Sequence, residues 1–276
     1  MILSSWPTLS SFVSVRVSRV SFSLSASHYS FAYKFNRGRT LRLVASAFVA
    51  VGACLGTQAA LADAGFRLLE IDGHQVKWGS PTLGSGATLT FAIVSDPNTF
   101  SGKTNCQRVS GISPILSRSR LSRHEFEHEL RAAFSMWERV ANVRFRAAKS
   151  AASADVLIST ESGSKGVAYA DVALASSDDA DGAVRRIVRG IVCLSPGVRW
   201  TTHDARPVTG KTQIDRGPYR LRYALAHEIG HVLGLDHPSP AGELMSFQYD
   251  SSSRHLRSGD VAGIIALYGP RRATLF

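Results

Sequence analysis

The stretch from His227 to His237 constrains this chain more than any other part of its sequence. It reads HEIGHVLGLDH and matches the pattern H-E-x-x-H-x-x-G-x-x-H at every fixed position. On a helix, His227 and His231 are four residues apart and project from one face, so both imidazoles can bind the same ion. Gly234 can adopt a positive φ, which ends the helix and lets the chain return His237 to that ion.

This arrangement of histidines predicts a catalytic zinc site. Three neutral nitrogen ligands leave one coordination position open, whereas structural zinc is closed by four protein ligands, often thiolates. Glu228 lies beside the ligands, where it can take a proton from water whose pKa the metal lowers toward about 7. We therefore expect one catalytic Zn²⁺ bound by His227, His231 and His237, with Glu228 as the general base.

The apolar residues around the motif predict a helix that packs on a hydrophobic core. At about 100° per residue, they fall together on the face opposite the histidines; they are Leu221, Leu225, Ile229 and Val232. The alternative is a helix that carries these histidines as ordinary surface residues. The complete set of fixed positions in the motif disfavours that alternative.

A second H-E-x-x-H occurs from His124 to His128, and we do not expect it to bind a metal. The apolar side chains of this segment repeat with a helical period and place both histidines on the opposite, solvent-facing side. These side chains are Phe126, Leu130, Ala133, Phe134, Trp137 and Ala141. Ser122 and Glu125 form an S-x-x-E capping box, and Arg131 stands where the longer motif needs glycine. The pattern predicts an amphipathic helix over residues 122 to about 141.

Residues 1–62 are predicted to be a leader with a secretory signal peptide, which leaves residues 63–276 as the mature domain. Basic residues between Lys34 and Arg42 precede an apolar run from Leu43 to Leu55, and Ala60-Leu61-Ala62 follows as a small-x-small cleavage site. The run is shorter than the roughly 20 residues of a membrane span. We therefore expect a secreted protein, extracellular or periplasmic, without stable membrane insertion. A permanent anchor and lipid attachment through Cys54 are the alternatives.

The charge of the mature domain does not favour nucleic acid as a partner. The leader holds six of the 32 basic residues and none of the 21 acidic ones, which leaves a mild excess of positive charge after cleavage. No aromatic and basic recognition motif accompanies that excess. Asp178, Asp179 and Asp181 offer a calcium site as an alternative, but the EF-hand template fails around them, which favours a solvated turn.

Two cysteines, Cys106 and Cys193, remain in the mature domain. In an exported protein such a pair suggests one disulfide. The alternative is two unpaired buried thiols.

The order of expected elements predicts an α+β fold with a mixed sheet. Strands are expected where β-type or buried apolar runs occur; these runs are Ala87–Val94, Val143–Arg146, Ala154–Ser159, Gly166–Val172 and Gly190–Leu194. Residues 96–119 are rich in Gly, Ser, Pro and Asn and are expected to form a loop that leads to the long helix.

The zinc motif and the residues after it resemble the metzincin metallopeptidases. The segment from Gly242 to Ser246 is similar to their Met-turn, which would place Met245 beneath the three histidines. Within this clan the chain is most similar to the matrixins. Trp137 in the long helix, the Ala154–Ile158 strand and a closing helix over Ser258–Gly269 carry that likeness.

The resemblance covers most of residues 76–270 and implies a metzincin, or zincin-like, catalytic domain. Such a domain has a twisted mixed β-sheet, a long backing helix, an active-site helix, and a small C-terminal subdomain with the Met-turn and a final helix. Pro238 is more similar to serralysins, but the calcium-binding repeats of that family are absent.

The resemblance also implies a secreted zinc endopeptidase that hydrolyses peptide bonds in protein or peptide substrates. The substrate would bind as an extra strand along the Gly166–Val172 edge. Tyr249 is expected either to assist at the metal or to form a wall of the pocket. The alternative function is a catalytically inactive zinc-binding exported protein or a surface binding module, which would not need Glu228. The sequence does not indicate the oligomeric state.

Two departures from the matrixin pattern limit what the resemblance implies. Tyr169 and Cys193 stand where animal matrixins have histidines for a second, structural zinc, so no second zinc is expected. There is also no match to the cysteine-switch propeptide, because the residues around Cys106 differ from that motif.

Overall fold

The computed structural model describes residues 65–99, 105–161, 163, 166–176, 182–203, 218–238, 242–247 and 254–272. These residues all belong to the unit of the chain that includes residues 61–276. The predicted leader and signal peptide with Cys54, the aspartates of the acidic stretch and Tyr249 lie outside the described residues.

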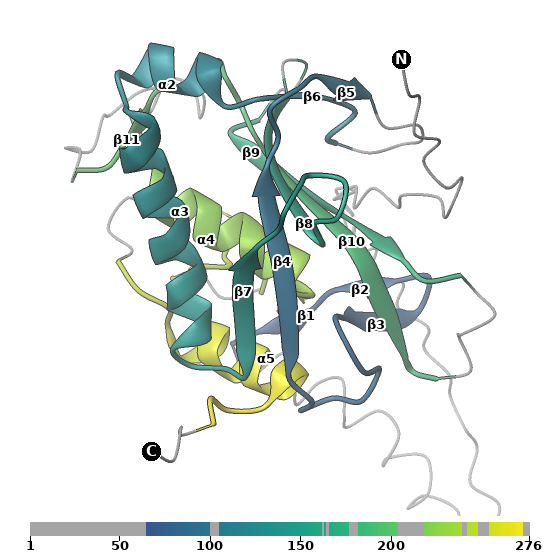
Figure 1. Cartoon of the computed structure of the whole chain (residues 1–276). Helices are drawn as coiled ribbons and strands as arrows, with labels where there is room; N and C mark the ends of the chain where they lie inside the picture. The colour runs from purple at the N-terminus through teal and green to yellow at the C-terminus, as the bar shows by residue number, and fades with distance from the viewer. Residues whose placement is uncertain are drawn as a thin grey trace, which may run out of the picture. The chain divides into compact units, whose positions relative to one another are not determined.

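A twisted mixed β-sheet forms the centre of the domain (Figure 1). Its main strands are β4 (Ala87–Ile93), β7 (Val143–Ala147), β8 (Val156–Glu161), β9 (Ala168–Leu174) and β10 (Val184–Leu194). The order β7-β4-β8-β10 is parallel throughout, and β9 pairs with β10 in the antiparallel direction. Every residue of β8 is buried, as expected for a strand covered on both faces. Within the described residues β9 pairs with no other strand, so it is an edge of the sheet.

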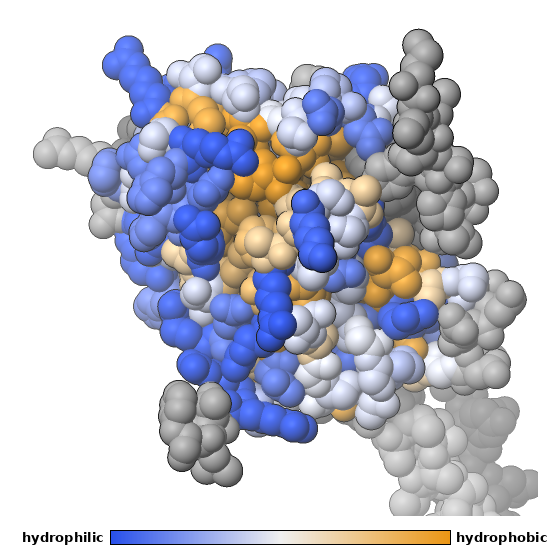
Figure 2. Space-filling view, in the orientation of Figure 1, coloured by the Kyte–Doolittle hydropathy of each residue, from blue (hydrophilic) through white to orange (hydrophobic). Residues whose placement is uncertain are grey.

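Two helices pack on one face of this sheet. The long helix α3 (Arg123–Glu138) buries its predicted apolar stripe, and its capping box is formed by Ser122 and Glu125. The helix α4 (Leu221–Val232) carries the first two histidines of the zinc motif and packs beside α3. Trp137 joins the two helices, because its indole Nε1 donates to the carbonyl of Ala226 at 3.0 Å. Figure 2 shows polar residues over the outward face of α3.

The chain beyond α4 forms a smaller part of the domain together with the first described strands. Strand β13 (Leu235–Asp236) pairs in the antiparallel direction with β1 (Arg67–Leu68), and α5 (Ser258–Tyr268) closes the fold. The short strands β2 (Glu70–Ile71) and β3 (His74–Lys77) continue from β1, and β3 pairs with the first residues of β10. Strands β11 (Trp200–Thr201) and β12 (Tyr219–Arg220) precede α4.

The predicted α+β fold is confirmed, including the mixed sheet, the backing helix, the active-site helix and the closing helix. The predicted loop over residues 96–119 is wrong, because this segment contains β5 (Asn98–Thr99), β6 (Arg108–Ser110) and α2 (Ser113–Ser119). Pro114 lies in the first turn of α2, where proline is compatible with a helix. The prediction treated that proline as a loop residue.

The last predicted strand also starts earlier than expected. β10 begins at Val184, because its first part pairs with β3 before the strand reaches β8. Within the described residues no helix has both the length and the hydropathy of a membrane span.

Candidate metal centre and active site

The structure brings the three motif histidines together at one end of α4. Their Nε2 atoms lie 3.1 Å apart between His231 and His227, 3.1 Å between His231 and His237, and 3.2 Å between His227 and His237. Ligand nitrogens about 2.0–2.1 Å from a tetrahedral zinc lie roughly 3.3 Å from one another. The spacing of the three nitrogens therefore fits a shared zinc ion.

The other ring nitrogens fix the tautomers of two of these histidines. Nδ1 of His227 lies 2.7 Å from the carbonyl oxygen of Leu244, and Nδ1 of His231 lies 2.9 Å from that of Leu235. A carbonyl oxygen only accepts hydrogen bonds, so each Nδ1 carries the proton and each Nε2 keeps its lone pair. Lone pairs that converge without a proton between them repel one another, and a cation at their centre satisfies them.

The environment keeps the histidines in the neutral form that binds metals. Loss of solvation lowers the pKa of His227 and of His231 to about 3, and the neighbouring histidine in each case lowers it further. Loss of solvation likewise lowers the pKa of His237 to about 4, with His227 and Arg67 adding to the effect. All three imidazoles are therefore neutral and ready to bind a metal near pH 7.

Two glycines of the motif are required by their surroundings. A Cβ at Gly230 would overlap Met245 Sδ and lie 3.0 Å from Trp137, so Met245 packs directly against α4 between the first two histidines. Gly234 has φ of 101°, a left-handed conformation that favours glycine, and it turns the chain from α4 toward His237. A Cβ at Gly234 would also overlap the carbonyl oxygen of Val76.

The turn that contains Met245 is held by a buried carboxylate of α5. Asp260 is 1% exposed and accepts hydrogen bonds from the backbone N–H groups of Leu244 at 2.8 Å and Met245 at 3.0 Å. Because the carbonyl of Leu244 accepts from His227, this carboxylate indirectly orients one histidine of the triad.

Glu228 is available for chemistry beside the triad. Glu228 is 8% exposed. Within the described part of the chain, no hydrogen bond or ion pair joins its carboxyl group to another residue. Burial raises the pKa of this carboxyl to about 8, and the charge of Asp171 raises it further. Phe247 is 62% exposed, and its ring centroid lies 5.2 Å from that of His237.

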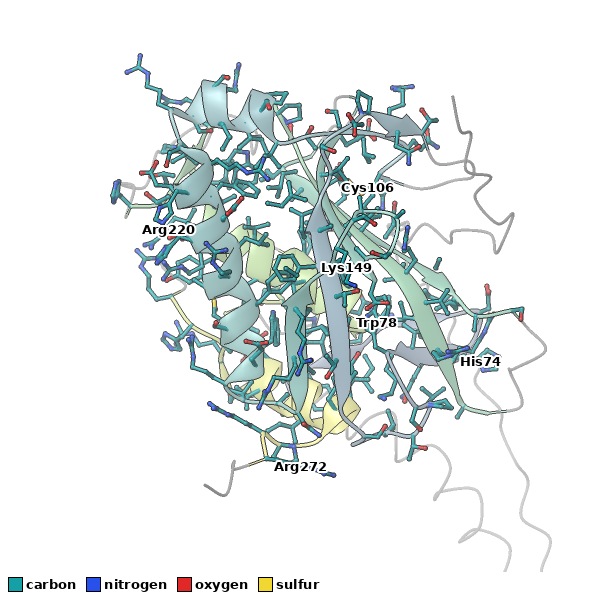
Figure 3. All side chains as sticks on the ribbon, viewed as in Figure 1. His74, Trp78, Cys106, Lys149, Arg220 and Arg272 are labelled. Atoms are coloured by element: carbon teal, nitrogen blue, oxygen red, sulfur yellow. A yellow bond between two sulfur atoms is a disulfide. The ribbon has the colours of Figure 1, made fainter. Side chains whose placement is uncertain are left out.

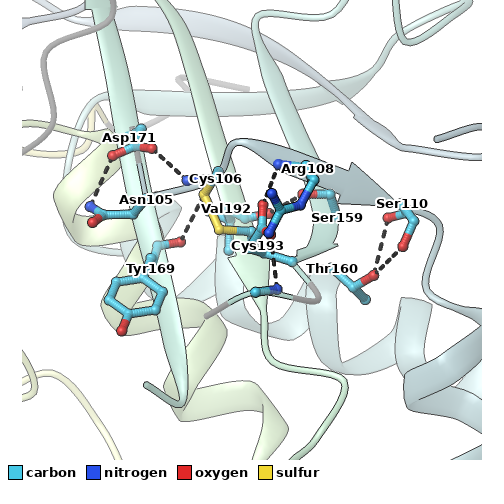
Figure 4. Close-up of a disulfide and its surroundings, with 12 residues drawn as sticks. Asn105, Cys106, Arg108, Ser110, Ser159, Thr160, Tyr169, Asp171, Val192 and Cys193 are labelled. Carbon is cyan, nitrogen blue, oxygen red and sulfur yellow. Dashed lines mark hydrogen bonds between the residues drawn. A yellow bond between two sulfur atoms is a disulfide. The ribbon is translucent and has the colours of Figure 1, made fainter. Parts of the chain in front are cut away.

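The two predicted disulfide cysteines are joined in the structure, and Cys193 lies on β10 beside the edge strand β9 (Figure 4). The segment that carries Cys106 is also bonded to β9, because Asp171 accepts from Cys106 N at 2.9 Å and from Asn105 Nδ2 at 3.0 Å. Burial raises the pKa of Asp171 to about 6. Tyr169 lies on the same strand and pairs with Cys193 of β10. The two positions compared with the histidines of a second zinc site are therefore a tyrosine and a disulfide-bonded cysteine.

The second H-E-x-x-H does not form a comparable group. His124 and His128 are both exposed on α3, and Glu125 is bonded to Ser122 in the capping box. Nδ1 of His128 lies 3.3 Å from the carboxylate of Glu129. Among the described residues, the triad of His227 and His231 on α4 and His237 directly after β13 is the one group of three metal-type side chains close enough to share an ion.

The fold and the histidine triad together define a metzincin-type metallopeptidase domain. Sequence comparison narrows this class: the family model described as Matrixin matches residues 114–269, and the chain belongs to the matrixins. This is a family of zinc-dependent metalloendopeptidases.

Similarity to individual matrixins is distant. The chain is 30% identical to macrophage metalloelastase of Oryctolagus cuniculus over 153 residues. This aligned segment covers 54% of this chain and 30% of that protein. It is 27% identical over 153 residues to karilysin of Tannerella forsythia, 55% of this chain and 30% of that protein. It is 28% identical over 182 residues to metalloendoproteinase 1-MMP of Arabidopsis thaliana, 62% of this chain and 46% of that protein. The chain thus spans less than half the length of each of these relatives.

Proposed function

We propose that this chain is an exported zinc endopeptidase that hydrolyses peptide bonds in proteins, with Glu228 as its general base. One observation carries the proposal: the Nε2 atoms of three neutral histidines converge, and the buried Glu228, which follows His227 on the same helix, has no hydrogen bond or ion pair to any residue that the structure describes. A protein that only stored zinc would not need a glutamate at this position.

Zinc bound by His227, His231 and His237 would supply Lewis-acid polarisation and would lower the pKa of a coordinated water toward about 7. Glu228 takes a proton from the attacking water and delivers it to the leaving amine. Glu228 must be charged to accept that proton, and the positive charge of a zinc ion held by the three neutral histidines would favour its charged form. The histidines keep their orientation during the reaction because backbone carbonyls hold two of the rings.

The edge strand β9 supports the proposed mode of substrate binding. An edge strand has unpaired N–H and C=O groups, so an extended peptide can pair with it as an additional strand. Main-chain recognition of this kind requires an extended segment of substrate and places few demands on its side chains. It therefore suits an enzyme that cleaves within protein chains.

Two features support export from the cytoplasm. Residues 1–62 have the sequence order of a secretory signal, and a disulfide such as that between Cys106 and Cys193 persists in oxidising compartments. Attachment through a lipidated Cys54 stays the alternative to release.

The test is the change Glu228→Gln, measured beside wild type and the surface control Glu127→Gln. Glutamine keeps the shape of the side chain and cannot accept the proton, so peptide hydrolysis should fall about 10²- to 10⁴-fold. Zinc content should stay at the wild-type level, because all three histidines remain. Near-normal hydrolysis by Glu228→Gln would refute the proposed base. Zinc binding without hydrolysis of any peptide in a broad library by wild type would favour the alternative of an inactive zinc-binding protein.

A further inference from the structure

The C-terminal end of α4 receives two hydrogen bonds from side chains outside the helix. The indole Nε1 of Trp78 donates to the carbonyl of Val232 at 2.7 Å, and the hydroxyl of Tyr268 donates to the carbonyl of Leu233 at 2.7 Å. The last carbonyls of a helix have no partner within the helix, so a buried helix end needs donors from elsewhere. Trp78, labelled in Figure 3, follows β3, and Tyr268 ends α5, so the two donors come from parts of the chain that are far apart in sequence.

The two donors also bind each other. The backbone N–H of Trp78 donates to the Tyr268 hydroxyl at 3.1 Å, so this hydroxyl accepts one hydrogen bond and donates another. Tyr268 is 0% exposed and Trp78 is 5% exposed, so water does not replace either bond. Lys77 packs its ammonium 5.0 Å from the centre of the Tyr268 ring, which further fixes the ring.

The carbonyl of the next residue, Gly234, also accepts a hydrogen bond from outside α4, from the segment between the first two described strands. The carbonyl of Gly234 accepts from the N–H of Leu69 at 2.7 Å. Strand β1 then pairs with β13, and Arg67 forms an ion pair of 3.1 Å with Asp236. Three consecutive carbonyls, those of residues 232–234, therefore have donors from outside α4, and they connect His231 to His237.

We propose that Trp78 and Tyr268 are positioning residues of the metal centre, because they fix the turn that sets the approach of His237 to the other two histidines. The inference rests on the proposed zinc site. Without these donors, two buried carbonyls would lose their partners, and the turn would shift to regain hydrogen bonds. The carbonyl of Leu235, which orients His231, lies directly after this turn and would move with it. Trp78 also lies before the residues matched by the family model, so the metal centre depends on chain outside that match.

The experiment compares zinc affinity of the full chain for wild type, Tyr268→Phe and the control Thr160→Val. Tyr268→Phe removes one oxygen and keeps the ring and its contact with Lys77. Thr160→Val removes another buried hydroxyl, which donates to the carbonyl of Gly111 at 3.1 Å, far along the sequence from the histidines. Competition with a chromophoric chelator should show about 10-fold weaker zinc binding for Tyr268→Phe. The control should bind zinc as wild type does.

A second variant and a second metal separate positioning from general loss of stability. Trp78→Phe removes the indole donor, and it decides the question if Tyr268→Phe does not fold. Visible absorption of the Co²⁺-loaded proteins reports ligand geometry and should change in both variants but not in Thr160→Val. Wild-type zinc affinity and spectra in both variants would overturn the inference while leaving the proposed function intact. Equal weakening by the control would also overturn it. Absence of zinc binding by wild type would overturn the proposed function and this inference with it.

Discussion

Gly230 lies on the face of α4 that meets Met245, between the first two histidines of the motif. Methionine Sδ and the Trp137 ring occupy the space that any side chain at this position would need. The neighbouring Leu244 carbonyl accepts from His227, so displacement of this turn would also disturb a metal-binding ring. A side chain at this position, which the zinc motif leaves variable, would therefore require Met245 to move.

We expect Gly230→Ala to lower the free energy of unfolding and to weaken zinc binding. Overpacking of a filled core typically costs about 1–3 kcal/mol, and the displaced turn carries the acceptor of His227. Urea denaturation and chelator competition would measure the two effects. The matched control is Gly197→Ala, because an added Cβ there would meet only Ser195 Oγ at 3.5 Å. Wild-type stability and zinc affinity in Gly230→Ala would contradict the packing described for Met245.

At the residue scale, the spacing of the motif predicted the three histidines. The groups that orient them could not be predicted, because they are brought to the histidines by long-range contacts. His227, His231 and His237 could be named because the motif contains all of them within one turn and helix. The groups that orient them, such as the carbonyl of Leu235 and the carboxylate of Asp260, carry no side-chain pattern that marks this role. A carbonyl is present at every residue, so only the folded chain selects the ones that accept.

At the scale of elements, periodicity predicted long segments well and missed short ones. The stripes of α3 and α4 and the buried run of β8 are long enough to identify their elements. The prediction of a loop over residues 96–119 failed because β6 has no sequence pattern of its own. It is stabilised by pairing with β8, which is distant in sequence. The first part of β10 was missed for the same reason, since its partner is β3.

The disulfide links β10 to the segment before β6, and its loss should destabilise the domain. The two cysteines are 87 residues apart, and the chain-entropy relation assigns such a closure about 4–5 kcal/mol as an upper value. We therefore expect Cys106→Ala combined with Cys193→Ala to unfold at lower urea concentration than wild type. The segment before β6 would also hold Asp171 less firmly.

The control for this prediction is the unreduced wild-type protein, unfolded and titrated for free thiols. It should show neither Cys106 nor Cys193 as a free thiol. Reactivity of both would refute the bridge and remove the reason for the expected destabilisation. Hydrolysis of peptides, if retained by the double variant, would show that the bridge stabilises the domain without taking part in the chemistry.

At the scale of the whole molecule, the histidine triad is supported by segments far apart in the sequence, the first described strands and the last helix. Strands β1 and β3 support the turn after α4, and α5 supports the turn that contains Met245. The family match over residues 114–269 takes in the histidines and α5 but not these first strands. The domain that holds the site is therefore longer than the segment that identifies its family.

The whole chain should bind one zinc, at the triad alone. Within the part of the chain that the structure describes, the exposed pair on α3 has no third ligand, and the strands that carry Tyr169 and Cys193 offer an aromatic residue and a bridged cysteine in place of histidines. Elemental analysis of the purified protein should therefore give one zinc per chain, and His237→Ala should bind zinc much more weakly. The control replaces His124 and His128 together by alanine. It removes two imidazoles, one more than His237→Ala removes, and should leave the zinc content unchanged. Two zincs per chain in wild type, or equal loss of zinc from the α3 variant and from His237→Ala, would show that a second group of residues binds the metal.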